Sequence, residues 1–133
     1  MALPARYRDA HRFAFGDSPE LADRLLALVL SGEKTATCGA LRDYEAPDPE
    51  LMPEVGRADV VLDGSGQPAC VIETISVEHC RFADVPEAFA LAEGEGAFED
   101  WQRGHRAFFE RNGGWSADML LVCERFRLVE VLG

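Results

Sequence analysis

A helical pattern of apolar residues lies in the segment 15–37. Its apolar positions follow the i, i+4, i+7, i+8 spacing of one helix face, at Leu21, Leu25, Leu28 and Val29. Ser18 suits the N-cap of a helix and Pro19 its first position, whereas Gly32 suits the C-cap. The pattern therefore predicts one amphipathic helix, after which the chain enters a strand or turn at Lys34.

Two β-strands joined by a tight turn are predicted between residues 57 and 82. The turn sequence DGSGQ is flanked by apolar residues at Val60, Leu62, Cys70, Ile72 and Ile75. The preceding segment 44–56 contains three prolines and is predicted to be an irregular loop. The segment 118–132, which is rich in apolar residues, is predicted to be one long strand or a bent pair of strands.

Two further helices are predicted between these strands, at 83–96 and 98–114. Asp84 suits the N-cap of the first helix. Gly94 and Gly96 are predicted to end this helix, which leaves Glu93 and Glu95 at the corner that follows it. The second has helically spaced residues at Trp101, His105, Phe108 and Phe109. Strands and helices are mixed without a regular βαβ order, so the predicted fold class is α+β.

The composition narrows the functional classes. A chain of 133 residues with 47% hydrophobic and 28% charged residues is expected to form a single domain (1–133), with residues 1–14 a candidate peripheral N-terminal arm. The formal net charge of -11 opposes binding to duplex nucleic acid, because phosphates repel an acidic surface. The four cysteines form no CxxC pair or zinc-type cluster, and no apolar run is long enough to span a membrane. These features predict reduced thiols, a cytoplasmic location and no membrane partner.

Lys34 is the only lysine in a chain whose other fixed positive charges are arginines. A buried or crowded lysine can lose its proton, whereas an arginine effectively cannot. Lys34 is therefore a candidate for chemistry that needs a neutral amine, and a solvated surface lysine is the alternative. Glu93 and Glu95 lie near a helix C-terminus, where the helix dipole disfavours carboxylates. This position indicates another reason for them, such as pairing with Lys34 or an arginine.

Several short motifs occur in a fixed order along the segment 15–132. They are the stretch from FGDSPEL to SGEKTAT, the turn DGSGQP, the corner AEGEG, the helix motif W...HR.FF and the final CERF. Together they resemble the ASCH domain family, and within it the bacterial stand-alone ASCH proteins. The resemblance implies a PUA-like β-barrel of mixed, largely antiparallel strands, flanked by helices, with a cleft between barrel and helices.

The resemblance also implies a set of site residues. Family members that remove the acyl group from N4-acetylcytidine use the lysine and the last threonine of a G-x-K-T-x-T motif, and the second glutamate of an A-E-x-E motif. These roles fall on Lys34, Thr37 and Glu95. Substrate-binding roles fall on Thr35, Arg42, Tyr44, Glu93, Trp101 and His105, although the aromatic residues and the histidine are also typical of core or rim positions. Arg42 comes later here than in the small deacetylases, and Ala97 follows the glycine corner, so the cleft rim is expected to differ.

Three functions remain as hypotheses. In the first, an acylated pyrimidine nucleoside or similar small molecule is hydrolysed: Thr37 attacks the amide, Lys34 takes its proton, and Glu95 passes a proton to the leaving amine. The second is binding of a nucleotide or short single-stranded RNA without catalysis, and the third is a metal-assisted ribonuclease that uses Glu93 and Glu95. The acidic charge favours the first, for which we expect no metal or cofactor and a monomer or homodimer. In a regular strand Lys34 and Thr37 would point to opposite faces, so the first hypothesis requires a turn or bulge between them.

Overall fold

The computed structural model describes residues 3–132. The elements follow in the order η1 (Ala5–Tyr7), β1 (Arg12–Phe13), α1 (Pro19–Ser31), β2 (Ala36–Ala40), α2 (Leu41–Glu45), β3 (Ala58–Leu62), β4 (Pro68–Arg81), η2 (Phe82–Asp84), α3 (Glu87–Ala92), α4 (Phe98–Arg111) and β5 (Leu120–Val131). Strands and helices are thus mixed along the chain, and the predicted α+β class is confirmed.

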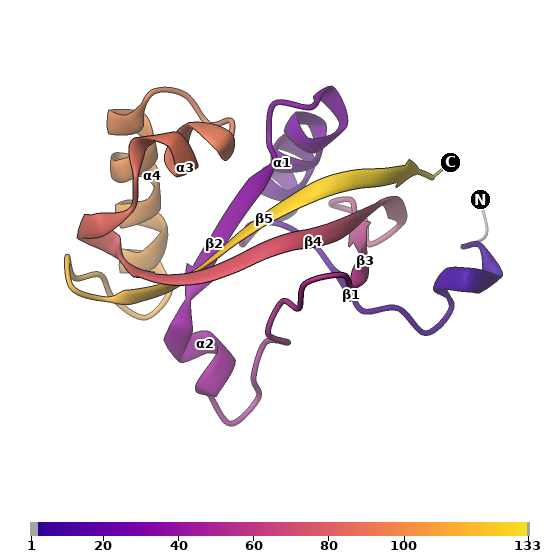
Figure 1. Ribbon diagram of the computed structural model, residues 1–133, viewed down its shortest axis with the longest axis horizontal. Helices are drawn as coiled ribbons and strands as arrows, with labels where there is room; N and C mark the ends of the chain where they lie inside the picture. Colours follow the sequence, from indigo (N-terminus) through magenta and orange to yellow (C-terminus); the bar gives the residue numbers. More distant parts are fainter. Residues whose placement is uncertain (1–2, 133) are drawn as a thin grey trace.

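The strands of the described chain form one sheet in the order β1-β3-β4-β5-β2. Neighbouring strands are antiparallel except β1 and β3, which run parallel. Figure 1 shows β4 and β5 side by side as the long centre of this sheet. The edge strands β1 and β2 do not pair with each other within residues 3–132, so the closed barrel expected from the resemblance is wrong. A barrel closes only where its edge strands hydrogen-bond to each other, and β1 is just two residues long.

Helix α1 has the ends that its sequence predicts. The Ser18 side chain accepts a hydrogen bond from the amide of Leu21 at the first turn, and Gly32 ends the helix with φ of 85°. Its buried face consists of Ala22, Leu25, Leu26 and Val29. This face packs on a cluster that includes Phe15, Val61, Cys70, Ile72 and Phe126. The helix is therefore fixed over the part of the sheet formed by β3, β4 and β5.

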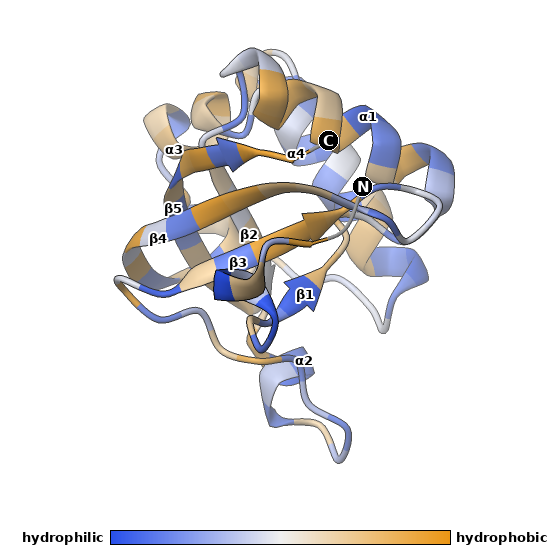
Figure 2. Cartoon of the chain, turned by 90° about the vertical axis from the view of Figure 1, so that its right-hand side faces the viewer, coloured by the Kyte–Doolittle hydropathy of each residue, from blue (hydrophilic) through white to orange (hydrophobic). Residues whose placement is uncertain are grey.

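Helices α3 and α4 gather at the other end of the sheet (Figure 1). Their buried residues surround Trp101 in a second cluster with Phe82, Phe89, Phe109, Leu121 and Cys123. The Phe82 and Trp101 rings stack with centroids 5.3 Å apart. In Figure 2 the strands carry long hydrophobic stretches, whereas α2, away from both clusters, is mostly hydrophilic. The helices thus cover the sheet as two packed groups, and the candidate site lies between them.

Two local predictions need correction. Asp84 does not cap the helix of the predicted segment 83–96, because it belongs to the 3-10 turn η2 and α3 begins only at Glu87. Pro86 takes the N-cap position with a backbone conformation that suits the residue before a helix, and no side chain caps it. Helix α2 was not predicted, because five residues are too few to show a helical period. The C-terminal segment forms one strand, β5, with register shifts along its pairing to β4.

The start of the chain contacts the sheet at two points. β1 pairs with β3, and the Tyr7 hydroxyl of η1 hydrogen-bonds to Glu130 of β5 at 3.2 Å. The predicted arm (1–14) and the predicted domain include residues 1–2 and 133, which lie outside the described residues. Among the described helices, none is both long enough and apolar enough to cross a membrane.

Candidate active site

Lys34 lies in the short loop between α1 and β2. Its amide donates to the carbonyl oxygen of Leu28 at 3.0 Å, closing the end of α1. β2 begins only at Ala36, so the alternation of a regular strand does not apply between Lys34 and Thr37. Both residues line one cavity of about 260 Å³. Lys34 and Thr37 therefore face the same cavity, as the hydrolase hypothesis requires.

We call this cavity the lysine cavity. Its polar lining consists of Lys34, Thr37, Cys38, Glu93, Glu95 and His105, together with Arg24 and Arg111. Its apolar lining includes Phe15, Leu21, Leu25 and Phe108. The turn after α1, the strand β2, the corner after α3 and the helix α4 all contribute. Five of the nine residues predicted for the site are thus brought together here.

The Lys34 side chain is buried, with 1% of it exposed. Its Nζ lies 3.1 Å from Glu93 Oε1 and 3.9 Å from Glu95 Oε2. Nζ also lies 5.4 Å from the centroid of the Phe15 ring, within the range of a cation–π contact. Burying a charge is costly unless it is paired, so these contacts are what allow a lysine at this position.

Glu93 has both carboxylate oxygens engaged. Oε1 accepts from Lys34, and Oε2 accepts from the indole N–H of Trp101 at 2.8 Å. His105 Nε2 also lies 3.4 Å from Oε1. Burial alone would raise the pKa of Glu93, but the Lys34 charge and the hydrogen bonds from His105 and Trp101 lower it well below its usual range. Glu93 is therefore a buried carboxylate that organises three side chains around it.

His105 is held on two sides. Its ring stacks on Trp101 with centroids 4.4 Å apart, and Nδ1 lies 3.0 Å from the Trp101 carbonyl oxygen. A carbonyl oxygen can only accept, so Nδ1 carries a hydrogen, and Nε2 faces the carboxylate of Glu93, which also favours a hydrogen there. Burial lowers the pKa of His105, but Glu93 and Glu95 outweigh it, so the pKa lies above its ordinary value. This geometry favours the imidazolium.

Glu95 differs from Glu93 in its access to the cavity. Its side chain is 20% exposed, compared with 1% for Glu93. Its nearest cations are more distant, with Arg24 at 3.8 Å and both Lys34 and His105 at 3.9 Å. Glu95 therefore retains oxygen atoms that can meet a ligand, and Glu93 does not.

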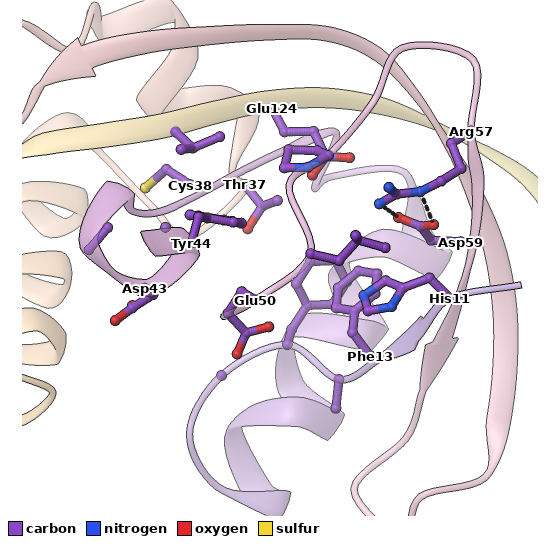
Figure 3. A pocket seen from close by; sticks show the side chains of 18 of the residues that line it. His11, Phe13, Thr37, Cys38, Asp43, Tyr44, Glu50, Arg57, Asp59 and Glu124 are labelled. Carbon is purple, nitrogen blue, oxygen red and sulfur yellow. Dashed lines mark hydrogen bonds and ion pairs between the residues drawn. The ribbon is translucent and has the colours of Figure 1, made fainter. Parts of the chain in front are cut away.

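A second cavity, of about 210 Å³, adjoins the first, and we call it the tyrosine cavity. Thr37 and Cys38 line both cavities. Figure 3 shows its other lining residues, including Tyr44 from α2, Glu124 from β5, and His11 and Phe13 from the N-terminal segment. Arg57 also lines it and binds Asp59 through two hydrogen bonds of 2.7 and 3.0 Å. The two cavities meet at the residue proposed as the nucleophile.

The remaining predicted residues lie elsewhere. Tyr44 lines the tyrosine cavity. Thr35 is exposed, and its hydroxyl lies 3.5 Å from the carbonyl oxygen of Ala92, outside both cavities. Arg42 is also exposed and donates to carbonyl oxygens just beyond α4, whereas Trp101 is buried and contacts the site through Glu93 and His105. The structure therefore gives Arg42 and Trp101 supporting contacts rather than access to either cavity.

Three potential metal ligands also lie close together. Ligand atoms of Cys38, Glu93 and His105 all lie within 4.8 Å of one another. Burial raises the pKa of the Cys38 thiol well above its usual range, which disfavours the thiolate that binds metals. The Glu93 oxygens already accept from Lys34 and Trp101. A cation at this cluster would therefore have to displace an ammonium and a thiol proton.

Several lining residues were not predicted from the sequence, among them Cys38 and Glu124. Cys38 was interpreted only as one of four reduced thiols, and no role was given to Glu124. Glu124 is the one acidic residue within the apolar run LLVCERF, and an acid in such a run is a signal of a buried polar group. Its meeting with Thr37 depends on how β2 and β5 pair, which local sequence does not show.

Comparisons with known proteins identify the family and similar structures. The sequence profile of the ASCH domain matches residues 11–130. A crystal structure of a protein from Enterococcus faecalis V583 is 37% identical, with a TM-score of 0.83 over 98% of this chain and 79% of that one. The crystal structure of an ASCH domain from Lactobacillus crispatus JV V101 is 38% identical, with a TM-score of 0.83 over 94% of this chain and 82% of that one. No curated protein matches the chain.

Proposed function

Because the chain belongs to the ASCH domain family, we propose that it is an amidohydrolase that removes the acyl group from the exocyclic amine of a pyrimidine nucleoside. N4-acetylcytidine represents this substrate class. The observation that supports the proposal best is the buried Lys34, which lies between two carboxylates and lines the same cavity as Thr37. Ionisable groups buried together at a cavity are typical of catalytic sites.

Thr37 acts as the nucleophile in this reaction. A threonine hydroxyl is weak and needs a base. Lys34 becomes that base by passing a proton to Glu95, the more exposed of its two carboxylates. The Thr37 proton then moves to the Lys34 amine as Oγ1 bonds to the acyl carbon. The C–N bond breaks, the leaving amine takes the proton held by Glu95, and an acyl ester remains on Thr37.

Water completes the reaction. Its oxygen bonds to the acyl carbon while one of its protons passes to Glu95. The ester C–O bond breaks, and Thr37 Oγ1 takes a proton from Lys34, which regains one from Glu95. The carboxylic acid product leaves and loses its proton to solvent. Glu93 contacts neither reacting bond, so it is a positioning residue that holds the Lys34 side chain.

Hydrolysis of N4-acetylcytidine, followed by chromatography of released cytidine, tests this proposal. The variants Lys34→Met, Thr37→Val and Glu95→Gln are each expected to lower kcat/KM by about a hundredfold or more. Thr35→Val is the matched control for Thr37→Val, because the Thr35 hydroxyl contacts Ala92 outside both cavities. Its kcat/KM is expected to stay within about twofold of the wild-type value, as for most surface substitutions.

Two outcomes would favour the other hypotheses. Loss of cytidine release on addition of a chelator would favour a metal-assisted reaction. Folded wild-type protein that binds a nucleotide or short single-stranded RNA but releases no cytidine would favour binding without catalysis. Release that survives the chelator and is lost in all three site variants would support the amidohydrolase.

A further inference from the structure

Glu124 is the cross-strand partner of Thr37. The two residues face each other in the register of β2 and β5, so their side chains lie on the same face of the sheet. Directly opposed residues have Cβ atoms about 4.5–5.5 Å apart. Both residues line the tyrosine cavity, and Figure 3 shows Glu124 close to Thr37 there. Any group that reacts with Thr37 from this cavity is therefore within reach of Glu124.

Glu124 is only 9% exposed, and just one of its oxygens is engaged. The hydroxyl of Thr74 donates to Oε2 at 2.6 Å. Within residues 3–132, no other group hydrogen-bonds to the Glu124 carboxyl group, so Oε1 remains available at the cavity. Among the described residues, Oε1 is not one of the fully buried side-chain atoms that lack a partner, so a group in the cavity can reach it. A ligand that donates an N–H to this oxygen would form a hydrogen bond there.

The charged side chains that line the tyrosine cavity determine which type of ligand it favours. Asp43, Glu50, Asp59 and Glu124 line it, and Arg57 is the one arginine among its lining residues. Arg57 is already bound through two hydrogen bonds to Asp59. The cavity therefore disfavours a phosphate or carboxylate and favours a neutral or cationic group with N–H donors. Tyr44 and Phe13 add aromatic surface that suits a flat ring.

The size of the cavities indicates that a ligand spans both. Each is smaller than the roughly 300 Å³ at which small-molecule pockets begin. They adjoin at Thr37 and Cys38. Both cavities are lined by apolar and charged side chains. In the lysine cavity the carboxylates are matched by Lys34 and two arginines, whereas in the tyrosine cavity four carboxylates face one arginine. The carbonyl of an acyl group therefore suits the first, and a ring with N–H donors suits the second.

We propose that the tyrosine cavity binds the amine-bearing heteroaromatic ring of the substrate, and that Glu124 determines specificity by accepting an N–H from that ring. The choice of ring rests on the proposed function, because it takes the scissile amide to lie at Thr37. In that pose Glu124 favours an exocyclic amino group over a carbonyl at the same ring position. Thr74 fixes the carboxyl group in the orientation that makes this selection.

Titration calorimetry with cytidine and uridine tests this specificity without any hydrolysis. The two nucleosides differ at one ring position, where cytidine has an amino group and uridine a carbonyl. Wild-type protein is expected to bind cytidine more tightly by about tenfold or more, the value of one hydrogen bond to a charged acceptor. Glu124→Gln can accept from Thr74 and present its amide N–H₂ to the ring, so it is expected to abolish or reverse the preference.

A second variant is needed because the new amide could turn its oxygen toward the ring and still accept the hydrogen bond. Thr74→Val combined with Glu124→Met removes both hydrogen-bonding partners together, which is close to neutral for folding when the shapes match. This double variant is expected to lose the preference by weakening cytidine binding while uridine binding changes little. Glu78→Gln is the control, because Glu78 is exposed on the neighbouring strand β4 and lines neither cavity.

The outcomes separate this inference from the proposed function. A Glu124-dependent preference for cytidine in a protein that hydrolyses no N4-acetylcytidine would support the ring site and overturn the hydrolase. Hydrolysis together with a nucleoside preference that both Glu124 variants retain would overturn the role of Glu124. Failure of the folded wild-type protein to bind either nucleoside would overturn it as well.

Discussion

Lys34 and Glu93 form a buried ion pair, with 3.1 Å between Nζ and Oε1 and 1% of each side chain exposed. The pair lies where the two core clusters meet, because Lys34 contacts Phe15 of one cluster and Glu93 binds Trp101 of the other. A buried ion pair contributes little net stability, yet removing one partner leaves an uncompensated charge. This pair therefore couples the proposed catalytic lysine to the packing of the whole domain.

The first prediction concerns the free energy of unfolding. Glu93→Gln is expected to lower it by about 3–5 kcal/mol, because the Lys34 charge loses its nearest partner in a buried site. Lys34→Met is expected to have a similar effect through the unpaired Glu93. The double variant Lys34→Met/Glu93→Gln is expected to be more stable than the sum of the two losses implies, since neither charge then remains. Urea unfolding of the four proteins measures this coupling.

Glu95→Gln is the control for this cycle. Its side chain is 20% exposed and its nearest cation is 3.8 Å away, so the loss is expected to stay below about 1 kcal/mol. Equal losses for Glu93→Gln and Glu95→Gln would contradict the distinct roles given to the two acids. Strictly additive losses in the double variant would contradict the pairing itself.

The second prediction concerns pH. The pKa of His105 is raised in the folded protein, because Glu93 and Glu95 outweigh the effect of burial. A raised pKa stabilises the folded state fully below the unfolded value of about 6.5, and this contribution is lost as pH rises through the folded value. NMR titration of the His105 ring is expected to show a midpoint above about 6.5. The stability difference between wild type and His105→Gln is expected to shrink as pH rises through that midpoint.

A midpoint below the ordinary value would contradict this account, because burial would then outweigh the two carboxylates. Glu93→Gln offers an independent check, since it removes the hydrogen bond that raises the pKa. The midpoint of His105 is expected to fall in that variant. An unchanged midpoint would show that Glu93 does not hold the proton on Nε2.

Much of the local structure could be predicted from the sequence, because its signals are local. Ser18, Pro19 and Gly32 mark the ends of α1 through their own backbone preferences, and the structure confirms them. The turn DGSGQ likewise joins β3 and β4 as predicted. The barrel was wrong for the opposite reason: closure depends on contacts between β1 and β2 at opposite edges of the sheet, and no local pattern reports such contacts.

Prediction of the site from the sequence has the same limit, because contacts between distant segments leave no local pattern. The order of the motifs was enough to indicate Lys34, Thr37 and Glu95, and the structure places all three along one cavity. The resemblance gave Glu95 a catalytic role and Glu93 a substrate-binding one, but the sequence could not show that Glu93 is the buried partner of Lys34, because burial depends on tertiary packing. Nor could it indicate Glu124, which meets Thr37 only through the pairing of β2 and β5.

The third prediction concerns Arg42. Its guanidinium donates to the carbonyl oxygens of Asn112 and Gly114, just beyond the C-terminal end of α4. A cation at this end of a helix is favourable, so Arg42→Ala is expected to lower the free energy of unfolding by about 1 kcal/mol. The kcat/KM for N4-acetylcytidine is expected to remain within about twofold. A rise in KM without any loss of stability would restore the substrate-binding role suggested by the resemblance.

The last prediction concerns Gly94, which separates the two acids of the site. Gly94 has φ of 78°, a left-handed conformation that costs other residues about 1–2 kcal/mol. A Cβ atom there would lie 2.6 Å from the carbonyl oxygen of Glu33, in the backbone just before Lys34. Gly94→Ala is therefore expected to lower the free energy of unfolding by more than about 2 kcal/mol, and to lower kcat/KM by about a hundredfold by displacing Glu95 from Lys34.

Two further variants separate the causes of this effect. Asparagine tolerates the left-handed conformation better than alanine but also has a Cβ atom, so Gly94→Asn is expected to remain destabilising through contact with Glu33. Gly104→Ala is the control for stability, because Gly104 lies within α4 and a Cβ atom there would meet nothing within 4 Å. It is expected to raise the free energy of unfolding by about 0.5–1 kcal/mol. If Gly94→Asn proved as stable as wild type, the close approach to the Lys34 turn could not be what requires glycine at this corner.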